Sequence, residues 1–132
     1  MKIRHAQMTV LADHGEALFE DRLVQVLLEH HPGAVDGLPD QQLRRYVRIA
    51  LAKGRSHGFT WQSALAGFCV LMFEVAPNFD LHPAFKRALA IRLPDENQRI
   101  KAIYANTTGE DWEDARAFAD PGAWGVESGV DA

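Results

Sequence analysis

The feature that most constrains the fold is an uninterrupted apolar run from Ala64 to Phe73. It lies within the segment Thr60–Pro83, which continues into a Pro-Asn-Phe-Asp turn and a second predicted helix start. A helix that is apolar on every side is buried, because it has no face to turn toward water. The run is about half as long as a bilayer-spanning helix. It therefore predicts a buried central helix over about residues 60–76.

The rest of the chain has helical periodicity broken by proline and glycine. At 132 residues the chain can bury a core without disulfides or metal. We expect an all-α fold, a compact bundle of about five to six helices that forms a single domain over residues 1–119. We expect residues 120–132 to be a flexible, acidic, glycine-rich tail unless Trp124 docks. The expected helices span residues 4 or 9 to 30, 39 to 57 and 60 to 76, with three more starting near 82, 95 and 108.

Local signals predict several helix ends. Gly58 is expected to close the second helix in a left-handed conformation. Thr60 is expected to cap the third helix, and Asp80 or His82 the fourth, because their side chains can accept hydrogen bonds from the first turn. Thr108, with an aspartate three residues later, resembles a capping box.

Charge is distributed unevenly along the chain. No acidic residue occurs between Gln41 and Phe73, although several basic ones do, whereas the segment from Thr108 to the end is strongly acidic. Such asymmetry can attract a charged partner. The candidate partner-binding residues are therefore Arg44, Arg45, Arg48 and Arg55 in the basic stretch, and Glu110, Asp111, Glu113 and Asp114 in the acidic one.

The sequence contains no recognisable catalytic or metal-binding motif. No two histidines lie four residues apart and no Glu-x-x-His occurs, so the helical zinc and di-iron patterns are missing. Cys69 lies in the apolar run and is expected in the core. Asp80-Leu81-His82 could orient an imidazole, but no nucleophile accompanies it, and a helix cap explains it more simply. We therefore predict no enzyme activity, no cofactor and no metal site. With no signal peptide, we expect a soluble cytoplasmic protein without membrane contact.

The basic residues of the second predicted helix allow three interpretations. They can form a solvated face, they can dock an acidic protein, or they can contact nucleic-acid phosphates. The nucleic-acid interpretation is disfavoured because the following helix has no Arg, Lys or Asn to reach base edges.

A set of short motifs in residues 1–93 carries a resemblance to a known group of proteins. These motifs are Gln7, Phe19-x-x-Arg22, His31-Pro32, Leu43-Arg44-x-x-Val47-Arg48, Lys53 to Phe59, and Phe68 to Asp80, with Leu71 to Asp80 (LMFEVAPNFD) the most specific. On these motifs the chain resembles the small helical accessory proteins encoded beside effector and spike genes of bacterial type VI secretion systems. One departure is His82-Pro83-Ala84-Phe85, where the family usually has a short acidic or proline-tryptophan segment.

This resemblance implies a non-catalytic co-chaperone or adaptor, which binds an effector, its loading chaperone or the spike. It brings no catalytic residues. The first alternative is an immunity protein that neutralises a neighbouring toxin, because the cluster from Glu110 to Asp114 would suit a basic toxin cleft. The remaining alternatives are a nucleic-acid-binding helical regulator and an enzyme.

Overall fold

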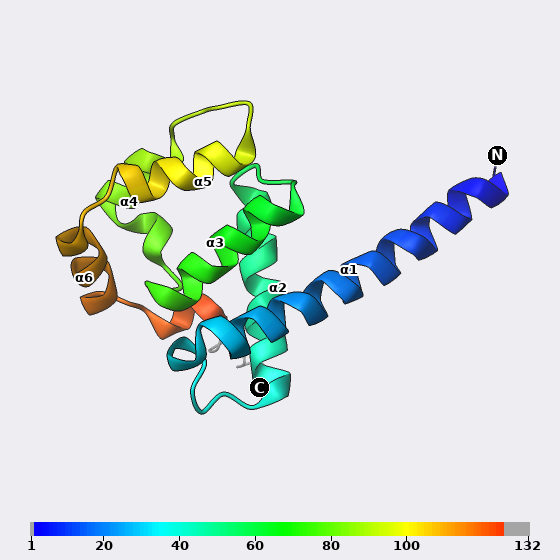
Figure 1. Ribbon diagram of the computed structural model, residues 1–132, viewed down its shortest axis with the longest axis horizontal. Helices are drawn as coiled ribbons and strands as arrows, with labels where there is room; N and C mark the ends of the chain where they lie inside the picture. The colour runs from blue at the N-terminus through cyan, green and yellow to red at the C-terminus, as the bar shows by residue number, and fades with distance from the viewer. Residues whose placement is uncertain (1, 126–132) are drawn as a thin grey trace. The chain divides into compact units, whose positions relative to one another are not determined.

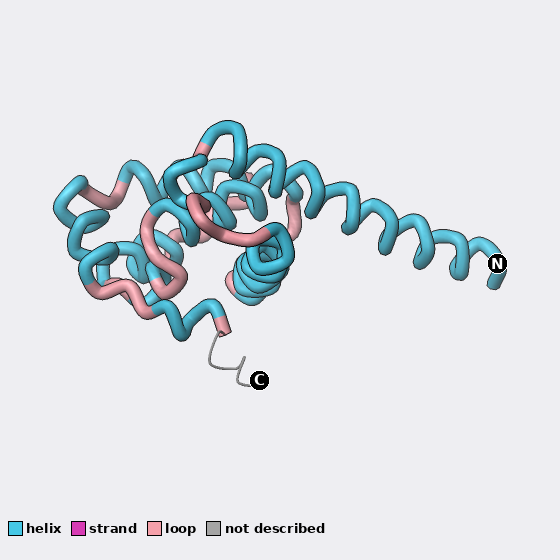
Figure 2. The backbone as a smooth tube through the Cα atoms, turned by 90° about the horizontal axis from the view of Figure 1, so that it is seen from below, coloured by secondary structure: helices cyan, strands magenta, loops and turns pink. Residues whose placement is uncertain are grey.

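The computed structural model describes residues 2–125, with side chains described from residue 15 onward, and confirms the all-α prediction. Figures 1 and 2 show helices joined by loops, with no strand in this part of the chain. The elements are α1 (Lys2–His30), η1 (Pro32–Ala34), α2 (Asp40–Ser56), α3 (Gln62–Glu74), η2 (Phe79–Leu81), α4 (Pro83–Leu89), α5 (Glu96–Ala105), α6 (Gly109–Ala117) and η3 (Pro121–Trp124), where η denotes a 3-10 helix.

The residue contacts divide the chain into two units, residues 1–47 and residues 48–132. The first unit contains α1, which continues through Gly15 without a break and ends before Pro32. η1 then packs back against α1. The buried residues Leu23 and Leu27 lie one helical turn apart on α1, as expected for an apolar stripe of a helix.

The second unit is organised around α3. No residue of α3 from Ala64 to Glu74 is exposed, which confirms the predicted central helix. α3 packs against α5, and α4 packs against both α5 and η2. Two glycines allow close approach: a Cβ on Gly54 would lie 3.0 Å from Leu65 Cδ2, and one on Gly67 would lie 3.0 Å from Ile100 Cγ2.

One predicted cap is wrong, and of the two residues expected to cap the fourth helix, Asp80 is not the one that does so. The cap position of α3 is Trp61, which makes no side-chain cap hydrogen bond. The Thr60 hydroxyl instead donates to Glu96 Oε2 at 2.6 Å. Glu96, a buried residue of α5, also accepts from the backbone N–H groups of Thr60 and Trp61. Asp80 does not cap α4, because its carboxylate lies in a buried ion cluster.

The other end signals are confirmed. Gly58 has a φ of 91° after α2, which favours glycine. His82 caps α4, since its Nδ1 accepts from the Ala84 N–H at 3.2 Å. Thr108 and Asp111 form both hydrogen bonds of a capping box at the start of α6. A local signal is sufficient wherever no distant side chain competes for the same group.

The end of the chain is described as far as Gly125. Trp124, the residue on which the predicted flexibility of the tail depended, is buried and lies against Phe73 with ring centroids 4.9 Å apart. Asp120 accepts from the Gly122 N–H at the start of η3. The predicted tail spans residues 120–132, and its part from residue 126 to residue 132 lies outside the described residues.

Phe68 provides a test of the core around α3. It is fully buried and its ring neighbours include Phe59 and Phe79. Phe68→Ala should lower the free energy of unfolding by about 3–5 kcal/mol, because it removes apolar contacts and leaves a cavity. Phe118→Ala, at a site that is 73% exposed, should cost less than about 0.5 kcal/mol. Chemical denaturation measures both, and equal costs would contradict this assignment of the core.

Candidate functional site

A groove lies in the second unit between the turn that follows α3 and helix α6. Its deeper part is a cavity of about 330 Å³, and an adjoining hollow of about 460 Å³ shares three of its lining residues. The shared residues are His82, Pro83 and Asp114. The deeper part is also lined by Asn78, Leu81, Ala115 and Phe118, and the adjoining hollow by Ala84, Arg87, Glu110 and Asp111.

Two large apolar side chains border the deeper part of this groove. Leu81 is 67% exposed and Phe118 is 73% exposed. They come from opposite walls, Leu81 from η2 and Phe118 from the residue that follows α6. Single apolar residues are common on surfaces, but exposed apolar side chains that border a groove mark a candidate binding surface.

A histidine–aspartate pair connects the two walls. His82 Nδ1 accepts from the Ala84 N–H, so in the neutral ring the proton is on Nε2. Nε2 then donates to Asp114 Oδ2 at 2.8 Å. His82 therefore caps α4 with one nitrogen and holds α6 with the other.

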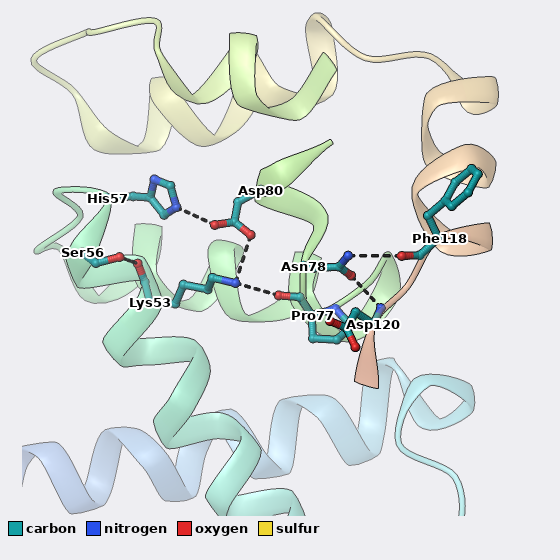
Figure 3. Close-up of polar contacts among 8 residues, drawn as sticks. All are labelled: Lys53, Ser56, His57, Pro77, Asn78, Asp80, Phe118 and Asp120. Atoms are coloured by element: carbon teal, nitrogen blue, oxygen red, sulfur yellow. Dashed lines mark hydrogen bonds and ion pairs between the residues drawn. The ribbon is translucent and has the colours of Figure 1, made fainter. Parts of the chain in front are cut away.

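The η2 wall is held in place by a buried carboxylate, as Figure 3 shows. Asp80 is 6% exposed. Its Oδ2 lies 3.0 Å from His57 Nε2, and its Oδ1 forms an ion pair with Lys53 Nζ at 3.0 Å. Lys53 also donates to the carbonyl of Pro77 at 3.0 Å. The end of α2 is thereby tied to the turn that carries Leu81 and His82.

Asn78 holds the α6 wall from the same turn. Its amide nitrogen donates to the carbonyl of Phe118 at 3.1 Å, and its Oδ1 accepts from the Asp120 N–H at 2.9 Å (Figure 3). Arg116 Nε donates to the carbonyl of Glu74 at 2.9 Å, so the last turn of α6 is fixed to the end of α3 as well. Both walls are thus ordered before any partner arrives.

The charge on Asp80 is favoured by its surroundings. Burial raises the pKa of this carboxyl group, but the hydrogen bond from His57 and the ion pair with Lys53 outweigh burial and hold the pKa below its ordinary value. The carboxylate is therefore ionised at neutral pH.

The predicted acidic residues fall partly on the groove. Glu110, Asp111 and Asp114 line it, whereas Glu113 is exposed on α6 but does not line it. Asp111 also accepts from the Thr108 N–H. The sequence interpretation missed Leu81 and Phe118, because a periodic pattern does not reveal which apolar residues remain uncovered.

The predicted basic residues lie on α2, and none of them is among the residues that line the groove. Arg44 is neutralised within the first unit by Asp21 at 2.5 Å and Asp40 at 3.0 Å. Arg45, Arg48 and Arg55 are exposed. The groove and the basic residues of α2 are therefore two separate candidates for the surface that binds a partner.

Cys69 is buried, as predicted, and burial raises the pKa of its thiol to about 12. At neutral pH it is therefore a thiol and not a nucleophilic thiolate. In the part of the chain that the structure describes, no three His, Cys, Asp or Glu side chains are arranged to hold a metal ion. Nor does any helix there have the length and apolarity to cross a bilayer.

Comparison with models of known protein families, with curated proteins and with solved structures found no match to this chain. Its function is therefore inferred from the groove and from the sequence resemblance.

The lowered pKa of Asp80 predicts a specific dependence of stability on pH. A carboxyl group whose pKa is lower in the folded state stabilises the fold above its unfolded pKa of about 4, and this contribution disappears as the pH falls through the folded value. Asp80→Asn should therefore cost about 1–3 kcal/mol at neutral pH, because it removes a charged partner. The difference from the unchanged protein should shrink below about pH 4.

Chemical denaturation between pH 3 and pH 7 measures this effect. Asp36→Asn, which removes an exposed carboxylate in the loop before α2, controls for the loss of one negative charge. A difference for Asp80→Asn that stays constant over the whole range would show that the charge of Asp80 does not stabilise the fold.

Proposed function

We propose that this chain is a non-catalytic accessory protein that binds another protein through the groove between η2 and α6. The observation that carries the proposal is the pair Leu81 and Phe118, which stay exposed beside a cavity whose walls are already tied together. An apolar anchor that enters a cavity is the usual centre of a protein interface. Ordered walls favour binding because little conformational entropy remains to be lost.

The charges around the groove support a particular kind of partner. Its lining includes three carboxylates, those of Glu110, Asp111 and Asp114, against the single guanidinium of Arg87. Asp114 is engaged by His82, whereas Glu110 is exposed. Complementary charge would steer a segment that combines Arg or Lys with at least one large apolar residue.

The sequence resemblance suggests where such a partner is found. In a type VI secretion system the chain would be a cytoplasmic adaptor or co-chaperone. It would bind an effector, the loading chaperone of that effector, or the spike. The segment that departs from the family, His82 to Phe85, contributes His82, Pro83 and Ala84 to the groove, so the departure would alter partner choice at this surface.

The acidic rim of the groove, formed by Glu110, Asp111 and Asp114, also supports the alternative of an immunity protein. Carboxylates at the edge of an apolar groove suit a basic toxin cleft as well as a basic adaptor partner. The same rim opposes binding of nucleic acid here, because phosphates would be repelled.

Substitutions in the groove test the proposal. The double variant Leu81→Ser and Phe118→Ser should weaken partner binding at least tenfold, because the apolar anchors carry most of the affinity of such an interface. Calorimetry with the products of the flanking genes measures affinity, and circular dichroism checks the fold. Leu28→Ser, at an exposed leucine of α1, is the matched control. Unchanged affinity of the double variant would place the interface elsewhere.

Reversal of the basic residues tests the competing surface on α2. If the groove is the binding surface, Arg45→Glu, Arg48→Glu and Arg55→Glu together should change the affinity by less than about threefold, as is usual for exposed charges outside an interface. A loss of tenfold or more would assign partner docking to α2. The same titration, repeated at two salt concentrations, separates a direct contact from long-range steering.

A toxicity assay distinguishes the adaptor from the immunity protein. An immunity protein should abolish the activity of the toxin domain it binds, whereas an adaptor should bind a non-toxic region, a loading chaperone or the spike and leave toxin activity intact. The groove variant should lose whichever effect the unchanged protein has.

A further inference from the structure

Two guanidinium groups converge on the space above Gly58, in the turn between α2 and α3. A Cβ built on this glycine would lie 3.6 Å from Nη1 of Arg92 and 3.6 Å from Nη1 of Arg99. Arg92 comes from the loop before α5, and Arg99 comes from α5 itself. Since glycine has no side chain, that space is left between the two positive charges.

Arg99 is buried without a carboxylate partner among the described residues. It is 6% exposed, and its Nη2 donates to the carbonyls of His57 at 3.2 Å and Leu89 at 3.3 Å. Its Nε is buried with no acceptor, and its guanidinium lies over the Phe59 ring, 4.2 Å from the centroid. A buried charge that has no counter-ion is costly, so the positive charge of Arg99 and its unpaired Nε need an explanation.

The nearest candidate counter-ion within α5 is already used elsewhere. Glu96 Oε1 accepts from the N–H groups of Thr60 and Trp61, both at 2.7 Å, and Oε2 accepts from the Thr60 hydroxyl. Burial, and after it the charge of Arg92, lowers the pKa of Arg99, while Glu96 raises it. The guanidinium group of arginine is not deprotonated in proteins at neutral pH.

We propose that Arg92, Arg99 and Gly58 form a binding site for a small oxyanion, either a carboxylate or a phosphate group. Guanidinium groups recognise both through paired charge-assisted hydrogen bonds. The ligand would occupy the space that a side chain at position 58 would fill, and it would supply acceptors to Nη1 of both arginines. It could be the carboxylate of an acidic partner segment or free phosphate. This site is independent of the groove.

Nuclear magnetic resonance on the full chain tests the site directly. Inorganic phosphate and acetate are titrated separately at constant ionic strength, with chloride as the balancing anion. The Gly58 amide and the Arg99 Nε–H signals should shift saturably with at least one of them. Arg92→Gln should weaken that binding at least tenfold, because it removes one of two charge-assisted partners. Lys101→Gln removes an exposed charge from α5, the helix that carries Arg99, and should leave binding unchanged.

The outcomes separate the two sources of the oxyanion. Saturation by both anions supports a carboxylate of an acidic partner segment, and saturation by phosphate alone supports phosphate or a phosphoryl group. Absence of saturable shifts, or equal binding by the unchanged protein and Arg92→Gln, would overturn the proposal. Arg99→Lys, which keeps the charge but loses the fork of donors, is a second variant that tests whether Arg99 binds the anion. If it is folded and binds phosphate or acetate as tightly as the unchanged protein, Arg99 is not part of the site.

Discussion

The buried carboxylate of Asp80 is the constraint on which the second unit depends most. α3 ends at Glu74, and Pro77 cannot continue it because proline has no N–H to donate and its ring clashes with the preceding turn, so this turn needs another source of order. Asp80 supplies it by accepting from His57 and pairing with Lys53, both on the last turns of α2 or just after it. Because Asp80 is flanked by Phe79, which is buried, and Leu81, which is exposed, fixing this carboxylate also fixes which side chain faces the core and which faces the groove.

The apolar helix α3 makes that arrangement possible. Phe68, one of its buried residues, contacts the rings of Phe59 and Phe79, with centroids 5.9 Å and 5.1 Å away. His57 lies against the same cluster, 5.4 Å from Phe68. The imidazole is therefore held by aromatic packing as well as by Asp80. Burial also limits solvent screening of the Asp80 charges, which strengthens the interaction with its partners.

The sequence was sufficient for the helices and insufficient for their polar contacts. The apolar run predicted α3, and Thr108 with Asp111 predicted the start of α6, because those features depend on residues within one or two turns. The same local logic predicts Thr60 as a cap and Asp80 as one of two possible caps for α4. Each is instead engaged with a residue more than 20 positions away, Glu96 for Thr60 and Lys53 with His57 for Asp80. A contact of this kind depends on how the helices pack, which no local pattern encodes.

Because local patterns do not encode how the helices pack, the sequence indicates only some of the residues that line the groove. Its carboxylates stood out as a cluster of charge in the sequence, but Leu81 and Phe118 looked like ordinary apolar residues. What distinguishes them is that both are largely exposed and border the same cavity, although the segments that carry them are fixed by Asp80, by Asn78 and by the pairing of His82 with Asp114. Rigid support for side chains that remain open to solvent contributes little to folding by itself. It does favour association, because the order that a partner would otherwise have to impose is already present.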